Sequence, residues 1–121
     1  MRVLIVDDHE VNIKLIDTIL KQSFEGMSID SARNGEAAVV LAHHFDYNLI
    51  LMDINMPVMD GIKASQLIKQ KRLGQSIIAV TASNIEEISN HLVEELFDSV
   101  VEKPLKINLF LEALQPYFSN S

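Results

Sequence analysis

Short apolar runs recur along the chain and predict the strands of a sheet. Four runs, rich in Val and Ile, cover residues 3–6, 49–52, 77–80 and, more weakly, 100–101. Unbroken runs of this length are typical of strands that are buried on both faces of a parallel sheet. Residues 27–31 alternate between apolar and polar side chains instead, which predicts a strand at the sheet edge with one face in water.

The segments between these runs carry apolar residues at helical spacing, which predicts five helices. Their apolar positions fall within residues 15–20, 38–45, 64–68, 85–96 and 107–114. Alternation of strands and helices across short links favours parallel pairing, because helices make the crossovers that parallel strands need. We therefore predict an α/β fold with an open, doubly wound, five-stranded parallel sheet and five helices.

Length and charge narrow the function classes. A chain of 121 residues has the length of one domain, so we expect residues 1–121 to form a single unit. Ten Lys and Arg against seventeen Asp and Glu give a net charge of −7, which disfavours direct contact with nucleic acid or anionic membranes. The chain has no cysteine, which excludes thiolate chemistry and fits a reducing cytoplasm, and we expect no membrane span.

Functional side chains follow the predicted strands at the point where each strand ends. Asp7 and Asp8 come after the first strand, Asp53 after the third, Thr81 after the fourth and Lys103 after the fifth. In open α/β sheets, ligands bind beyond the carboxyl ends of the strands, near the point where the strand order reverses. The sequence therefore predicts one site at this edge of the sheet.

The three acids have two interpretations. Each could simply cap the N-terminus of the helix that follows it, as Asp often does. Three carboxylates that converge at one edge favour a cation, because two such charges about 5 Å apart repel by about 3 kcal/mol at an effective dielectric of 20. Oxygen ligands select a hard ion, and room for waters and a phosphate favours Mg²⁺.

Thr81 and Lys103 could be a strand-end residue and a surface charge. Together with a carboxylate and a metal ion, however, they complete the set that phosphoryl transfer needs. The carboxylate is a nucleophile, and the metal ion, the ammonium and the hydroxyl hold the oxygens of the transferring group. The combination predicts phosphoryl transfer more strongly than any member does.

Four motifs carry a resemblance to a known family. They are Leu-Ile-Val-Asp-Asp at residues 4–8, the stretch from Leu51 through Asp53 to Gly61, Val-Thr-Ala-Ser at residues 80–83, and Glu-Lys-Pro-Leu at residues 102–105. In this order the chain resembles, over nearly its whole length, the receiver domain of two-component response regulators. The resemblance implies a flavodoxin-like sheet with strand order 2-1-3-4-5.

The resemblance also implies a function for the predicted site. Asp53 would be the phosphoacceptor, and Thr81 and Lys103 would contact the phosphoryl oxygens. The donor would be a histidine kinase or a histidine phosphotransfer domain, and a downstream effector would read the result. The protein would then be a phosphorylation-dependent switch, and an enzyme only toward its own phosphorylation and dephosphorylation.

A magnesium site is implied as well. Asp8 would be a direct Mg²⁺ ligand, Asp7 would act largely through metal-bound water, and Asp53 and the backbone carbonyl of Asn55 would complete the protein ligands. The four histidines, including His9 after the acid pair, are interpreted as structural or solvated residues rather than phosphohistidines.

The chain departs from the family pattern in two places. Val100 occupies the position where most receivers have an aromatic switch residue, and Leu96 and Phe97 replace the small residues that commonly begin the turn before the last strand. Either change could alter the surface that partners contact.

Two alternatives follow. One is a receiver-like interaction module that signals without phosphorylation, which Val100 suggests. The other is an enzyme with an aspartyl nucleophile, which is disfavoured because Asn55 stands where a second carboxylate would act as acid and base. Nucleotide binding lacks support, since no glycine-rich phosphate loop is present.

Overall fold

The protein folds as a five-stranded parallel sheet with helices on both faces, described here in a computed structural model over residues 1–82 and 90–118. The sheet order is β2-β1-β3-β4-β5, and all four pairings are parallel. This confirms the predicted fold class and strand order. The strands are β1 (Arg2–Val6), β2 (Ser28–Ala32), β3 (Leu49–Met52), β4 (Ile77–Thr81) and β5 (Ser99–Glu102).

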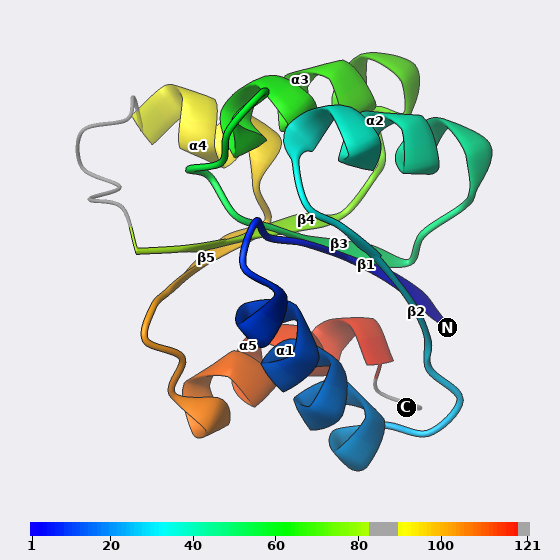
Figure 1. The fold of residues 1–121 in the computed structure, drawn as a ribbon, viewed down its shortest axis with the longest axis vertical. Helices are drawn as coiled ribbons and strands as arrows, with labels where there is room; N and C mark the ends of the chain where they lie inside the picture. The colour runs from blue at the N-terminus through cyan, green and yellow to red at the C-terminus, as the bar shows by residue number, and fades with distance from the viewer. Residues whose placement is uncertain (83–89, 119–121) are drawn as a thin grey trace.

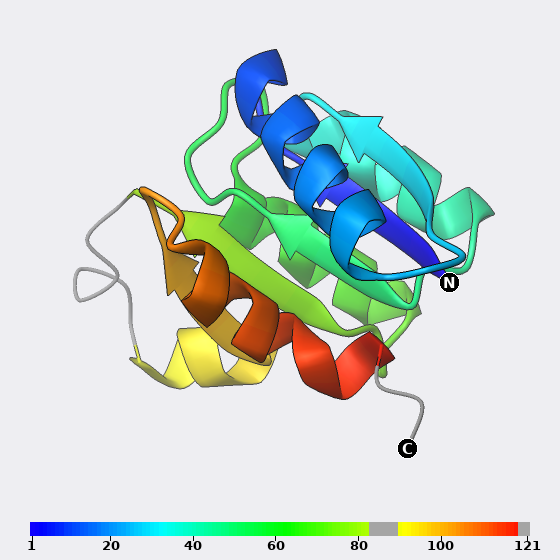
Figure 2. The ribbon, with the colours of Figure 1, turned by 90° about the horizontal axis from the view of Figure 1, so that it is seen from below.

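The helices cover the sheet from two sides. They are α1 (Glu10–Ser23), α2 (Gly35–His44), α3 (Gly61–Lys71), α4 (Asn90–Leu96) and α5 (Ile107–Phe118). Figure 1 shows α2, α3 and α4 on one face and α1 and α5 on the other, and Figure 2 shows α1 and α5 across the second face. Among the described residues, no helix is long and apolar enough to cross a membrane.

The three central strands divide the core into two layers. Alternate residues of each strand point to opposite faces, so Leu4 and Val6 of β1 join the cluster under α2, α3 and α4, while Val3 and Ile5 join the cluster under α1 and α5. Every residue of β3 and β4 is buried. Burial of each such side chain stabilises the fold by about 1.5–3 kcal/mol, so this double-sided burial holds the central strand ends rigidly in place.

The edge strands differ slightly from their predicted limits. β2 lies at one edge, as its alternation predicts, but runs one residue later than residues 27–31 because Ala32 still pairs with Val6. β5 lies at the other edge and extends beyond residues 100–101, since it pairs along β4 from Ile78 to Thr81. Its residues are only partly buried, which explains why its apolar signal is weak.

Two helices begin at residues whose side chains cap them. Asn34 caps α2 by accepting a hydrogen bond from the N–H of Ala37, and Asp60 caps α3 by accepting one from the N–H of Lys63, both at 2.8 Å. Asn and Asp are among the best residues for this role. Within the predicted helix 85–96, α4 accounts for residues 90–96, whereas Ile85 and Ile88 lie outside the described residues.

Candidate functional site

The carboxyl ends of β1 and β3 lie side by side and carry the first two acids of the site. The N–H of Asp7 donates to the carbonyl of Ala32 at 3.1 Å, and the N–H of Asp53 donates to the carbonyl of Val6 at 2.9 Å. These bonds continue the sheet one residue beyond each strand. They hold Asp7 and Asp53 at the same level of the edge, where both acids are buried.

Lys103 joins the two acids from the end of β5. Its N–H donates to the carbonyl of Thr81 at 2.9 Å, which fixes its backbone beside β4. Its Nζ lies 2.7 Å from Asp7 Oδ2 and 3.3 Å from Asp53 Oδ2. Burial lowers the pKa of this ammonium group, but the hydrogen bond to Asp7 and the charge of Asp53 outweigh burial and raise it overall. The lysine is therefore a permanent positive charge at the site.

The carboxyl group of Asp53 is costly to ionise in the folded protein. Burial raises its pKa most, the charge of Lys103 lowers it in part, and the charge of Asp7 raises it further. The net pKa of Asp53 lies above its ordinary value. The fold therefore stabilises the neutral form of Asp53 relative to the unfolded chain, and a positive charge brought near Asp53 would relieve the cost of ionisation.

This shift predicts how stability depends on pH without metal. A carboxyl group with a raised pKa in the folded state favours folding below the unfolded pKa of about 3.9, and this contribution is lost as the pH rises through the folded value. The Asp53→Asn variant has no carboxyl group to ionise at this position, so it does not lose this contribution to stability as the pH rises. Urea unfolding in EDTA should therefore show the variant gaining stability relative to the wild type between pH 4 and neutral pH.

Asp60→Asn is the matched control for this measurement. Asp60 is exposed at the start of α3, and asparagine preserves its capping role. If the difference in free energy of unfolding between wild type and Asp53→Asn stayed constant across the same pH range, burial would not raise the pKa of Asp53.

Asp8 and His9 extend the cluster toward solvent. Asp8 Oδ1 is a buried atom that accepts no hydrogen bond, although His9 Nδ1 lies 3.1 Å away. Asp7 Oδ1 accepts a hydrogen bond from the N–H of His9 at 2.9 Å, so Asp7 also orders the start of α1. Buried polar atoms normally have partners, and a cation would supply one to Asp8. The donor set therefore fits a divalent ion.

The remaining predicted residues lie at the same edge of the sheet. Thr81 is the last residue of β4 rather than the first after it, and it is fully buried. Asn55 follows in the loop after β3, where its backbone N–H hydrogen-bonds to the Asp53 carboxylate and lowers that pKa. Ser83, at the end of the third motif, lies outside the described residues.

The loop between β3 and α3 is packed against the backbone of Asp53. A β-carbon on Gly61 would lie 2.1 Å from the Asp53 carbonyl oxygen, and the N–H of Gly61 donates to the carbonyl of Ile54 at 2.7 Å. Within the loop, Val58 has a φ of +70°, and a hydrogen bond of 2.8 Å from the N–H of Met59 to Pro57 closes a tight turn. Such a φ is rare for a β-branched residue, so surrounding contacts hold the loop in shape.

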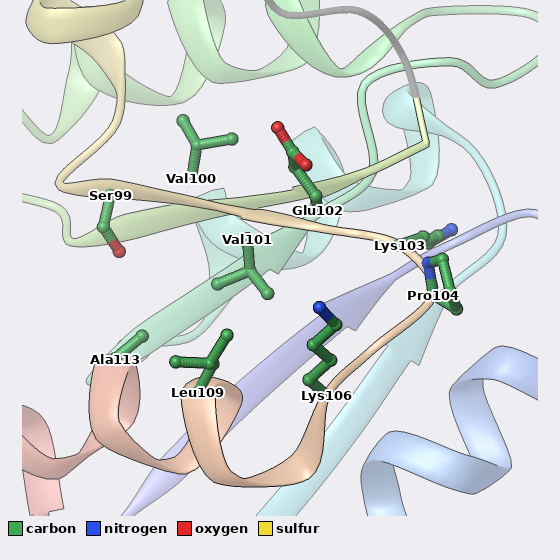
Figure 3. A pocket seen from close by; sticks show the side chains of 9 residues that line it. All are labelled: Ser99, Val100, Val101, Glu102, Lys103, Pro104, Lys106, Leu109 and Ala113. Carbon is green, nitrogen blue, oxygen red and sulfur yellow. The ribbon is translucent and has the colours of Figure 1, made fainter.

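A hollow of about 510 Å³ lies beside the edge strand rather than over Asp53. Figure 3 shows Ser99 and Val101 on the face of β5 toward α5, and Val100 and Glu102 on the opposite face. Of Asp7, Asp8, Asp53, Thr81 and Lys103, only Lys103 borders this hollow. Val100 also borders the hollow, and it packs against the core layer under α2, α3 and α4.

Sequence reasoning missed two features of the site. His9 was expected to be structural or solvated; its side chain is 70% exposed, yet its Nδ1 lies within 3.5 Å of an oxygen of each neighbouring acid. Adjacency to Asp7 and Asp8 was the only available signal. Gly61 was noted only as the end of the second motif, whereas its missing side chain lets α3 begin directly against Asp53.

Comparison with known proteins gives a consistent result. The family model of the response regulator receiver domain matches residues 3–115. The chemotaxis protein CheY of Halobacterium salinarum is 36% identical, with 93% of this chain and 92% of that protein covered. The autoinducer 1 sensor kinase/phosphatase LuxN of Vibrio campbellii is 40% identical across 93% of this chain, which spans only 13% of LuxN. Several other matching kinases are similarly long, with 12% to 15% covered.

A solved structure resembles the fold in detail. The receiver domain of the sensor histidine kinase PA1611 from Pseudomonas aeruginosa matches with a TM-score of 0.83 and 28% identity, over 98% of both chains. In that crystal structure a magnesium ion is coordinated in the active site cleft.

Proposed function

The chain belongs to the response regulator receiver domain family, and from this premise we propose that Asp53 is its phosphoacceptor. The observation that carries the assignment is the buried Asp53 carboxylate with the Lys103 ammonium 3.3 Å away. A nucleophile and a fixed positive charge at one strand edge are what transfer of an anionic group requires. Receivers are signalling switches of two-component systems, and Asp53 would carry the signal here.

The transfer would run from a phosphohistidine to Asp53. An Asp53 carboxylate oxygen attacks phosphorus in line as the nitrogen–phosphorus bond breaks, and the donor imidazole leaves with the electron pair. Lys103 exchanges part of its contact with Asp7 and Asp53 for the phosphoryl oxygens, while the Thr81 hydroxyl donates to another of them. The histidine would come from a histidine kinase or a histidine phosphotransfer domain.

Asp7, Asp8, Asp53 and the backbone carbonyl of Asn55 would hold Mg²⁺. The unpartnered buried Oδ1 of Asp8 and the cost of ionising Asp53 both support a cation at this place. When bound, the ion neutralises charge on the carboxylates and on the phosphoryl group. Asp7 keeps its hydrogen bonds to Lys103 and to the backbone of His9, so we assign it a role largely through metal-bound water.

The protein would act as a switch and not as an enzyme on small substrates. Asn55 offers no second carboxylate to work as acid and base two residues after Asp53. Val100 has few rotamers and little volume, so it cannot fill space beside Thr81 as an aromatic side chain would. The signal would therefore reach a downstream effector through the chain after Thr81 and through α4.

The same proposal includes the domain boundaries, the cellular location and the partners of the protein. Residues 1–121 would form one receiver domain that works in the cytoplasm with a kinase-type donor. The net charge of −7 supports a protein partner rather than direct contact with nucleic acid or membrane. A second candidate, a receiver-like module that signals without phosphorylation, is favoured by Val100 alone.

The labelling test separates these two candidates. Incubation with acetyl phosphate and Mg²⁺ should add one phosphoryl group per chain, seen by intact-mass measurement, and EDTA should prevent the addition. Peptide mapping should place the label on Asp53. An unlabelled wild type at millimolar Mg²⁺ would favour the phosphorylation-independent module, and a label on another residue would refute the assignment of Asp53.

A further inference from the structure

His9 lies beside Asp7 and Asp8, the two acids that follow β1. Its Nδ1 lies 3.1 Å from Asp8 Oδ1 and 3.5 Å from Asp7 Oδ1. Neither separation has the geometry of a side-chain hydrogen bond, and Asp8 Oδ1 is buried without a donor. One nitrogen and two carboxylate oxygens therefore lie within 4.8 Å of one another as charge partners, with no hydrogen bond between the imidazole and either carboxylate.

The separations match those of ligands around one metal ion. Zinc binds imidazole nitrogen and carboxylate oxygen at about 2.0–2.2 Å. Two ligands at these lengths are roughly 3.0 Å apart at a right angle and roughly 3.5 Å apart at a tetrahedral angle. The His9 distances to Asp8 and Asp7 are close to these two values, so one ion could contact the imidazole nitrogen together with a carboxylate oxygen of either acid.

We propose that His9 is an additional metal ligand, through which the acidic cluster binds a borderline divalent ion of the Zn²⁺ class in competition with Mg²⁺. The inference rests on the proposed function, because it concerns the same carboxylates. Imidazole suits zinc and its neighbours, whereas Mg²⁺ prefers oxygen ligands and retained waters. His9 would thus determine which ion occupies the site, and replacement of Mg²⁺ by an ion of the Zn²⁺ class would regulate phosphorylation of Asp53.

The position of His9 makes this role easy to isolate. His9 is the N-cap residue of α1, but its side chain makes no capping hydrogen bond. Its side chain is largely exposed, so His9→Ala removes the nitrogen without opening the core. His91→Ala is the matched control, because His91 is also exposed and also lies beside an acid, Glu95, in α4.

Calorimetric titration with ZnCl₂ and with MgCl₂ tests the proposal. His9→Ala should weaken Zn²⁺ binding at least tenfold more than Mg²⁺ binding, and added Mg²⁺ should weaken Zn²⁺ binding to the wild type. His91→Ala should leave the ratio of the two affinities unchanged. If added Mg²⁺ did not weaken Zn²⁺ binding to the wild type, the Zn²⁺ ion would bind elsewhere and the inference would be overturned.

The outcomes also separate this inference from the proposed function. If His9 were only a charge partner of Asp8, its removal would change both affinities by the same factor, and the inference would fail while Mg²⁺ binding stood. If millimolar Mg²⁺ did not bind the wild type at all, the magnesium site of the proposed function would fail, whatever Zn²⁺ did.

Discussion

Phosphorylation by acetyl phosphate should be almost completely lost in Asp53→Asn, with the labelling rate falling roughly a thousandfold or more. The amide has neither the charge nor the basicity of the carboxylate, so no oxygen at this position can attack phosphorus. Lys103 and Asp7 remain in place, since they hydrogen-bond to each other at 2.7 Å without Asp53. Intact mass followed over time, in the presence of Mg²⁺, measures the loss.

Asp60→Asn serves as the control for labelling. Asp60 belongs to the same connection between β3 and α3 as Asp53, but it is exposed, caps α3 and accepts a hydrogen bond from the N–H of Lys63. Its amide variant should label at the wild-type rate. Stoichiometric labelling of Asp53→Asn would mean that another carboxylate accepts the phosphoryl group.

Gly61→Ala should be among the most destabilising single methyl additions in this protein, with a cost of about 3 kcal/mol. The new β-carbon would meet the Asp53 carbonyl oxygen at 2.1 Å and the Cα of Ile54 at 2.8 Å. Both are backbone atoms next to a buried strand, so neither can turn away as a flexible side chain would. Relief requires α3 or the end of β3 to shift, and urea unfolding measures the cost.

The same shift should impair the site. Displacement of the Asp53 backbone moves its carboxylate relative to Lys103, so labelling by acetyl phosphate should slow even where the variant is folded. Gly74→Ala is the control, because a β-carbon at Gly74 meets nothing within 4 Å. A Gly61→Ala variant as stable as Gly74→Ala would show that α3 is not pressed against Asp53.

Most of the fold is predictable from local patterns. The runs at residues 3–6, 49–52 and 77–80 are apolar because both of their faces are covered by helices. Burial on both faces therefore makes these strands recognisable from a single sequence. The run at residues 100–101 is weaker because β5 lies at an edge and is only partly buried. Strand limits were less predictable, since pairing continues to Thr81, beyond the apolar run of β4, and to Ala32, beyond the alternating residues 27–31.

The site was only partly predictable for a different reason. Asp7, Asp53 and Lys103 follow strand ends, and parallel strands bring such positions to one edge, so their meeting could be expected. The partners of each charge could not, because they depend on side-chain directions. That Lys103 would bridge two acids, or that His9 would turn toward Asp8, follows from the folded geometry and not from residue spacing.

The hydrogen bond between Lys103 and Asp7 joins residues 96 positions apart. During synthesis Asp7 is made early and Lys103 only after all five strands, so the carboxylates of a nascent chain lack their positive partner until β5 docks. If Asp53 is the phosphoacceptor, as proposed, reactivity toward a phosphodonor would require the finished sheet. A truncated or misassembled copy, even one that retains Asp53, would be silent in the signalling pathway rather than wrongly active.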